Sequence, residues 1–127
     1  MRSAKIESGR AEFALSEVKR VKESKDGTQK EYKSYCRKFP SIVQTNGLAA
    51  SVAFLKEKSK DKDNAYNHLY TNIARWLMEC KLLSGDIELM TYICELETPQ
   101  YRIVTKEVLA LFNWLRRFAS GLIEGEV

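Results

Sequence analysis

The sequence predicts an all-α protein, a single compact bundle of five to six helices that spans residues 1–127. Three observations lead to this fold class. Apolar residues recur every three or four positions through most of the chain, which is the spacing of one helix face. No stretch alternates apolar and polar residues between hairpin turns, as strands do. Hydrophobic residues make up 44% of the 127, which is enough to build one core.

Two helices are expected in the first third of the chain. The first runs from about Ser3 to Glu23, and Asp26-Gly27 after it is a turn signal. Thr28 then opens the second helix, with Glu31 three residues later in the pattern of a capping box. The apolar residues of this second helix fall on one face: Tyr32, Tyr35, Cys36, Phe39 and Val43.

The stretch 39–55 carries no charge, in a chain where 30% of residues are charged. Pro40 removes a helical N–H and kinks or ends a helix, so one bent helix and two short ones both remain open here. Asn46 and Gly47 favour the backbone conformation at which helices stop. The helix that begins at Leu48 has apolar or small residues in every direction, so we expect it to be the buried central helix. Pro40, Asn46 and Gly47 are therefore the predicted structural turn.

A charged loop over residues 56–64 should lead into the next helix. Asp61, Asp63 or Asn64 is expected to be its N-cap. The apolar stripe that defines this helix has six members: Tyr66, Leu69, Tyr70, Ile73, Leu77 and Cys80.

The carboxy-terminal part of the chain predicts a short helix and a long one. The segment 84–86 should end the preceding helix and cap the short one, from Ile87 to about Leu96. Thr98-Pro99 has the pattern of an N-cap followed by a first-turn proline. The long helix shows the clearest period in the chain, at Tyr101, Val104, Val108, Leu111, Leu115, Phe118 and Leu122.

The apolar stripe of this long helix is wider than one neighbouring helix needs, because Phe112 and Trp114 extend it. Part of it is therefore expected to remain exposed for contact with another subunit. We name Trp114, Arg116 and Arg117 as the candidate contact residues.

Charge is unevenly distributed along the chain, which carries a net charge of +4. Residues 1–60 have a net charge of +7, whereas residues 61–98 have −4 and residues 99–127 have +1. A polyanion or an acidic protein surface is the natural partner for the basic half, although a solvated lysine-rich surface would show the same pattern.

No residue pattern indicates catalysis, a cofactor or a metal site. His68 is the only histidine and has no second motif element, and there is no glycine-rich phosphate loop. Asp61 and Asp63 lack the glycine and glutamate of a calcium loop. The three cysteines form no CxxC pair, which indicates reduced, buried thiols in a cytoplasmic protein. We expect a non-enzyme with no leader sequence and no membrane segment.

Candidate nucleic-acid-binding residues are the basic side chains opposite the apolar face of the second helix and at the end of the third. The tyrosines fall on core stripes, so we interpret them as packing residues rather than platforms for base stacking. Contact with nucleic acid should then go to phosphates. The candidates are Lys30, Lys33, Arg37, Lys38, Lys56 and Lys58.

Two blocks of sequence resemble one known family. YKSYCRKFPSIVQTNGLAASVAFLKEK (residues 32–58) has aromatic-x-x-Tyr, two basic residues, an apolar-Pro pair, Asn-Gly-Leu and Ala-Phe-Leu. YRIVTKEVLALFNWLRRFASG (residues 101–121) has Tyr-Arg, Thr-x-Glu, Trp-Leu, two basic residues and Phe-Ala. Both blocks and their spacing resemble the small helical subunit of the Cmr complex, the type III-B CRISPR RNA-silencing effector. Lys33 and Ser41 depart mildly from that pattern, where glycine and alanine are expected.

The resemblance implies a non-catalytic role beside other Cmr subunits. Copies of the chain would stack as a second filament next to the backbone and large subunits. They would line the channel for the guide RNA–target RNA duplex and hold the target strand by its backbone, while base pairing reads the sequence.

Two other functions remain open from the residues alone. A helical protein–protein adaptor could use the basic face to bind an acidic partner. A DNA-binding helix-turn-helix would use residues 86–96 and the helix after Pro99, but its first helix would be acidic and its second too long.

Overall fold

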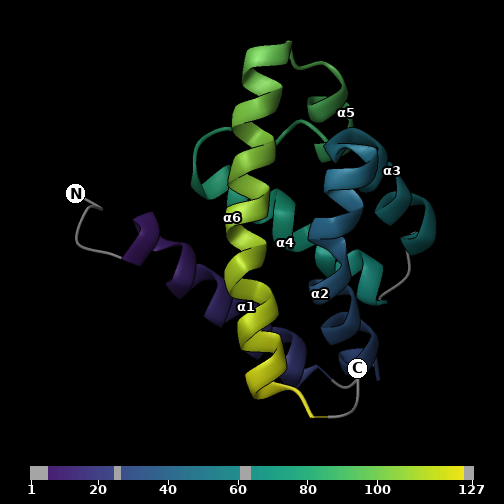
Figure 1. The fold of residues 1–127 in the computed structure, drawn as a ribbon, viewed down its shortest axis with the longest axis vertical. Helices are drawn as coiled ribbons and strands as arrows, with labels where there is room; N and C mark the ends of the chain where they lie inside the picture. The colour runs from purple at the N-terminus through teal and green to yellow at the C-terminus, as the bar shows by residue number, and fades with distance from the viewer. Residues whose placement is uncertain (1–5, 25–26, 61–63, 125–127) are drawn as a thin grey trace.

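A computed structural model describes residues 6–24, 27–60 and 64–124. Over these residues the structure contains six α-helices, a short 3-10 turn and no strand, which confirms the all-α prediction (Figure 1). In chain order the elements are η1 (Ile6–Gly9), α1 (Arg10–Glu23), α2 (Gln29–Asn46), α3 (Leu48–Ser59), α4 (Ala65–Glu79), α5 (Leu89–Cys94) and α6 (Thr98–Leu122).

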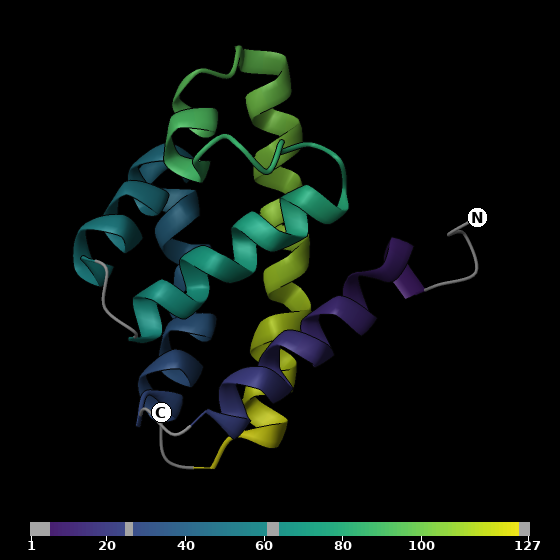
Figure 2. The ribbon, with the colours of Figure 1, turned by 180° about the vertical axis from the view of Figure 1, so that it is seen from behind.

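The long helix α6 forms the axis of the bundle. It packs against α1 and α2, while α4 packs against α2 and α3 and crosses the bundle obliquely (Figure 2). The heptad pattern of the sequence is confirmed in its central part, where the inward positions are fully buried. The buried residues of α6 are Val104, Val108, Leu111, Phe112, Leu115 and Ala119.

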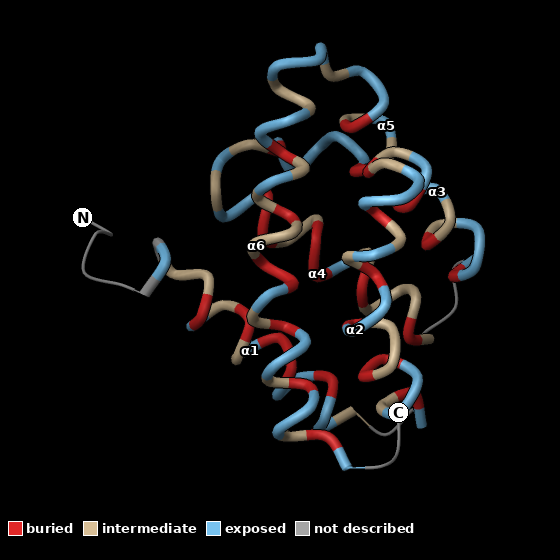
Figure 3. Tube along the Cα trace, viewed as in Figure 1, coloured by how far each residue is buried: buried red, intermediate tan, exposed pale blue. Residues whose placement is uncertain are grey.

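The helix α3 is not the buried centre of the core, so this prediction was wrong. It lies at the edge of the bundle, against α2, α4 and α5 (Figure 3). Leu48, Val52 and Leu55 are buried, but Ala50 and Ala53 on the other side are exposed. Small side chains carry little apolar area, so their exposure to water costs little free energy. A helix that is apolar all round in sequence can therefore still have a solvent face.

Pro40 lies inside one continuous helix, which decides between the two alternatives that the sequence left open. The helix ends at Asn46, and the Gly47 N–H donates to the Val43 carbonyl at 2.7 Å. Gly47 has φ 87° and ψ 159°, a conformation available almost only to glycine. The predicted turn at Asn46-Gly47 is thus confirmed, whereas Pro40 is a helical residue.

The amino terminus of α3 is capped by a side chain from another helix. No side chain at Gly47 can cap it, and the Tyr101 hydroxyl of α6 instead accepts a hydrogen bond from the Ala49 N–H at 2.8 Å. A Cβ atom at position 47 would lie 3.4 Å from the same hydroxyl. Gly47 therefore allows both the turn and the close approach of α6.

In the amino-terminal half, the start of the first helix and the capping of the second differ from the predictions. The α-helix starts at Arg10 because residues 6–9 form a 3-10 turn that ends in Gly9 with φ 91°, and Ser3 lies outside the described residues. Thr28 is the N-cap of α2, but its side chain makes no capping hydrogen bond, so the predicted capping box is not formed.

Boundaries in the second half are closer to expectation. Asn64 is the N-cap of α4 and accepts a bond from the Asn67 N–H at 2.9 Å, whereas Asp61 and Asp63 lie outside the described residues. The helix ends at Glu79, earlier than predicted, because the chain turns at Lys81 with φ 61°. The short helix α5 is shorter than predicted at both ends, and α6 begins at Thr98 with Glu97 as N-cap.

Two polar networks cross the apolar core. The Glu107 carboxylate of α6 accepts bonds from Arg10 Nε at 2.7 Å and Nη2 at 3.1 Å, and from Trp76 Nε1 at 2.7 Å. In the second network the Tyr32 hydroxyl donates to Asn72 Oδ1 at 2.7 Å, and Asn72 Nδ2 donates to the buried Glu17 carboxylate at 2.8 Å. Because such bonds are directional, they fix the rotation of α1, α2 and α4 around α6.

Replacement of Gly47 by valine should destabilise the protein by about 1–2 kcal/mol or more, because valine cannot adopt this backbone conformation without strain. The free energy of unfolding, measured by urea denaturation, checks this. Gly121→Val in α6 is the matched control, since Gly121 has open space around it and no positive φ. Equal effects at the two positions would contradict the role of Gly47.

Glu107→Gln should destabilise the protein at neutral pH by roughly 1–3 kcal/mol, because Arg10 loses a charged partner. The hydrogen bond from Arg10 is the main cause that holds the pKa of Glu107 below its usual value, against the opposing effect of burial. Stabilisation from a lowered pKa is present above the unfolded-state pKa and disappears as pH falls through the folded-state value. The wild type should therefore lose more stability than Glu107→Gln below about pH 4. Thermal melts between neutral and acidic pH test this, with the exposed Glu57→Gln as control.

Candidate nucleic-acid interface

The outer face of α2 is basic, as the sequence predicted. Lys30, Arg37 and Lys38 are exposed, with the apolar residues of the same helix turned toward α4 and α6. None of these three cations forms an ion pair with any residue that the structure describes. Their charge is therefore available to an external anion.

Lys33 is not part of this exposed face, so its predicted exposed position was wrong. Its side chain is only 8% exposed, and Nζ donates to the Ile123 carbonyl at 2.9 Å. Ile123 is the C-cap of α6, where a cation is favoured by the helix dipole and by the unpaired carbonyls. The alkyl stem of a lysine can be buried while its ammonium finds a polar partner, so Lys33 ties α2 to the end of α6.

The two candidates from α3 differ from each other. Lys56 Nζ lies 3.6 Å from the Glu88 carboxylate and 5.2 Å from the Tyr70 ring centroid, so it bridges α3 to the start of α5. The Tyr70 hydroxyl donates to the same Glu88 carboxylate. Lys58 is exposed and has no carboxylate partner among the described residues. Lys58 therefore remains a candidate, whereas Lys56 already has an anionic partner.

Three aromatic side chains that sequence reasoning placed in the core or left unassigned are half-exposed and adjacent. Tyr35 of α2 and Tyr66 of α4 have ring centroids 4.9 Å apart, and Phe54 of α3 lies 5.9 Å from Tyr66. Lys38 Nζ lies 5.4 Å from the Tyr35 centroid, and Lys58 Nζ lies 5.8 Å from the Phe54 centroid. Tyr35 and Tyr66 also pack against the core, as their positions on apolar stripes predicted.

The Tyr66 hydroxyl lies on the side of this cluster that carries a carboxylate. Hydrogen bonding to Tyr35 is the main cause that raises the pKa of Tyr66, with burial and Glu31 adding to it. The phenol therefore stays neutral at physiological pH. The cluster is thus bordered by lysines at Tyr35 and Phe54 and by Glu31 near the Tyr66 hydroxyl.

The candidate subunit contact on α6 is partly engaged within the chain. Trp114 is half-buried, stacks on Phe118 with centroids 5.7 Å apart and donates to Glu7 Oε1 at 2.9 Å. Arg116 and Arg117 are exposed, and Arg116 Nη2 lies 3.3 Å from Asn113 Oδ1. Contact of these residues with another subunit stays a prediction.

The described residues contain no cluster of metal ligands. Within them, no three His, Cys, Asp or Glu side chains converge as metal ligands. Burial raises the pKa of the Cys36 thiol to about 12, so this group is not a nucleophile at neutral pH. Cys94 is exposed, which corrects the expectation that all three thiols are buried. The His68 ring packs edge-on against Tyr32, with centroids 6.1 Å apart.

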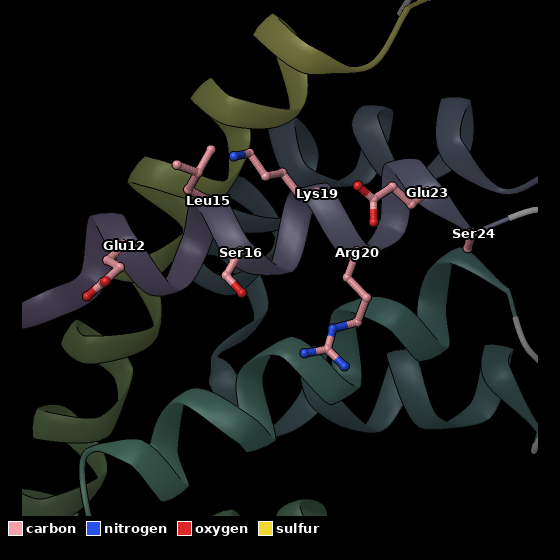
Figure 4. Close-up of a pocket in the computed structure, with 7 residues that line it drawn as sticks. All are labelled: Glu12, Leu15, Ser16, Lys19, Arg20, Glu23 and Ser24. Atoms are coloured by element: carbon pink, nitrogen blue, oxygen red, sulfur yellow. The ribbon is translucent and has the colours of Figure 1, made fainter.

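A surface hollow of about 750 Å³ lies along α1 and is open. Figure 4 shows that its charged side chains point in different directions rather than toward one point. An active site needs polar groups that converge on a bound substrate. The hollow is lined by Glu12, Leu15, Ser16, Lys19, Arg20, Glu23 and Ser24. None of the described helices is long and apolar enough to cross a bilayer.

Lys33→Met should destabilise the protein by about 1–3 kcal/mol, because it leaves the Ile123 carbonyl without this donor. The exposed Arg37→Met is the matched control on the same helix and should change stability by no more than about 0.5 kcal/mol. Chemical denaturation of both variants provides the measurement. Equal stability of the two variants would contradict the buried position of Lys33.

Comparison with known proteins supports the resemblance seen in the sequence. Residues 6–122 match the family model described as CRISPR-associated protein (Cas_Cmr5). The CRISPR system Cmr subunit Cmr5 of Thermus thermophilus is 33% identical over 113 residues, which cover 88% of this chain and 93% of that protein. The X-ray crystal structure of a CRISPR-associated Cmr5 family protein from the same organism matches with a TM-score of 0.76 at 30% identity, over 98% of this chain and 99% of the other. The chain therefore belongs to the Cmr5 family of CRISPR-associated proteins.

Proposed function

We propose that the chain is a non-catalytic small subunit of a type III-B CRISPR (Cmr) ribonucleoprotein and that it binds the RNA backbone through the α2 basic face. We define this face as Lys30, Arg37 and Lys38 of α2 together with Lys58 of α3. The observation that carries the proposal is that these four cations are exposed and have no carboxylate partner among the described residues. Unpaired cations on one surface attract phosphate without reading sequence.

Family membership supports a role within an assembly. The Thermus relative is named as a subunit of the Cmr system, and the Cmr5 family is generally a non-catalytic small subunit. We infer that this chain contacts the backbone and large subunits and further copies of itself. Those copies would stack as a second filament that lines the channel for the guide RNA–target RNA duplex and would hold the target strand. Trp114, Arg116 and Arg117 are the residues proposed for contact between subunits.

A helix-turn-helix function finds no support in the geometry. The first helix of such a motif would be α5, which has only six residues, and the second would be α6, which has 25. Neither length fits a compact helix-turn-helix, in which the second helix lies in the major groove. An adaptor that binds an acidic protein would use the same basic face, so the experiment has to separate it from RNA binding.

Arg37→Ala/Lys38→Ala should weaken binding of target RNA to the assembled complex similarly for every target sequence. The slope of log affinity against log salt should fall by roughly one for each neutralised contact. Filter binding over a salt series measures both quantities. The variant should fold normally, because both side chains are exposed.

Arg102→Ala/Lys106→Ala on α6 is the matched control, since it removes the same charge from exposed positions of another helix. Unchanged affinity and slope in an α2 variant that still assembles would refute the proposal. Loss of assembly without loss of RNA binding by the remaining complex would instead favour the adaptor.

A further inference from the structure

The three aromatic rings beside the α2 basic face, Tyr35, Phe54 and Tyr66, form one continuous surface across three helices. Phe54 is nearly perpendicular to Tyr66, with an interplanar angle of 86°, and lies 6.3 Å from the Tyr35 centroid. All three rings are partly exposed, although each also packs on the core. A structural role alone needs only their buried edges, so the exposed parts are available to a ligand.

A hollow of about 370 Å³ continues this surface between α2 and α3, with Phe54 as one of its walls. The other lining residues are small, apolar or neutral: Ile42, Asn46, Ala50 and Ser51. The Ser51 hydroxyl is already bonded to the Gly47 carbonyl at 2.7 Å. The Asn46 side chain is exposed and makes no hydrogen bond to any residue that the structure describes. Its amide offers both a donor and an acceptor, which is what the edge of a nucleobase requires.

Positive charge borders the aromatic surface. Lys38 and Lys58 lie within cation–π distance of Tyr35 and Phe54, respectively, and neither ammonium is neutralised by a described carboxylate. Glu31 lies near the Tyr66 hydroxyl. A ligand that fits here therefore combines a flat, weakly polar body with a negatively charged link on the lysine side.

From this arrangement we infer that the hollow beside Phe54 receives an unstacked base of single-stranded RNA, with the neighbouring phosphates against Lys38 and Lys58. This inference rests on the proposed RNA-binding function and adds a base contact to it. In this inference Tyr35 and Tyr66 pack on the core and also form part of the surface on which the base stacks. Stacking on aromatic rings tolerates any base, so the contact does not compete with reading by the guide.

Charge favours RNA over a protein segment at this surface. An apolar helix from another subunit would bury Lys38 and Lys58 without anionic partners, which is unfavourable. A nucleotide supplies the base for the rings and the phosphate for the lysines together. The same combination of a basic groove and aromatic platforms is used by proteins that bind single strands.

The test compares the binding of two fluorescent oligomers, oligouridylate and an abasic ribose-phosphate chain of the same charge. Each is about twelve units long, which is within the site size of one binding module. The full chain should bind oligouridylate at least about fivefold more tightly in fluorescence anisotropy titrations at low salt. Phe54→Leu should remove this preference while leaving affinity for the abasic chain unchanged. Lys58→Ala should weaken both oligomers equally.

Phe118→Leu is the matched control, because it makes the same change at a half-buried ring on α6. Equal binding of the two oligomers by wild type, or no binding of either, would overturn the inference. So would a Phe54→Leu variant that keeps the full preference for bases. None of these results bears on the salt dependence of RNA binding by the assembled complex. The proposed backbone contact is therefore tested separately. If the Phe54→Leu variant no longer assembles into the complex but keeps its preference for bases, the surface contacts a protein partner instead.

Discussion

The carboxylate of Glu107 is the interaction on which the arrangement of the bundle depends. It lies on the central helix α6 and accepts hydrogen bonds from Arg10 of α1 and Trp76 of α4. Trp76 is 2% exposed, so its indole N–H has no alternative partner in water. A half-buried carboxylate is costly unless it is paired, and here one group joins three helices. Apolar packing alone would allow α1 and α4 to rotate on α6, whereas these bonds select one orientation.

The second network extends this constraint to the helix that carries the basic face. Glu17 of α1, Asn72 of α4 and Tyr32 of α2 are linked by buried hydrogen bonds. Lys33 then attaches the next position of α2 to the end of α6. With both sides of α2 fixed in this way, Lys30, Arg37 and Lys38 must face solvent. Stability and the proposed function are thus coupled through the rotation of one helix, although they use different residues.

The proposed interface separates two kinds of contact with RNA. In this proposal Lys30, Arg37 and Lys38 of α2 attract phosphates, and their effect depends on salt but not on sequence. The aromatic surface formed by Tyr35, Phe54 and Tyr66 offers stacking, which depends on the presence of a base but not on its identity. Neither contact reads sequence, which suits a subunit of an effector whose specificity comes from base pairing with a guide.

The sequence by itself determined the helices, the turn at Asn46-Gly47 and the membership of α2 in a basic surface, because helix period and glycine conformation are local properties. It also determined the family, through two blocks that lie on α2–α3 and on α6. It did not reveal the burial of Lys33, whose partner Ile123 lies ninety residues away, or the pairing of Lys56 with Glu88. It likewise assigned α3 to the centre of the core. A helical wheel shows which residues share a face, but only the packing of distant segments decides which faces are covered from water.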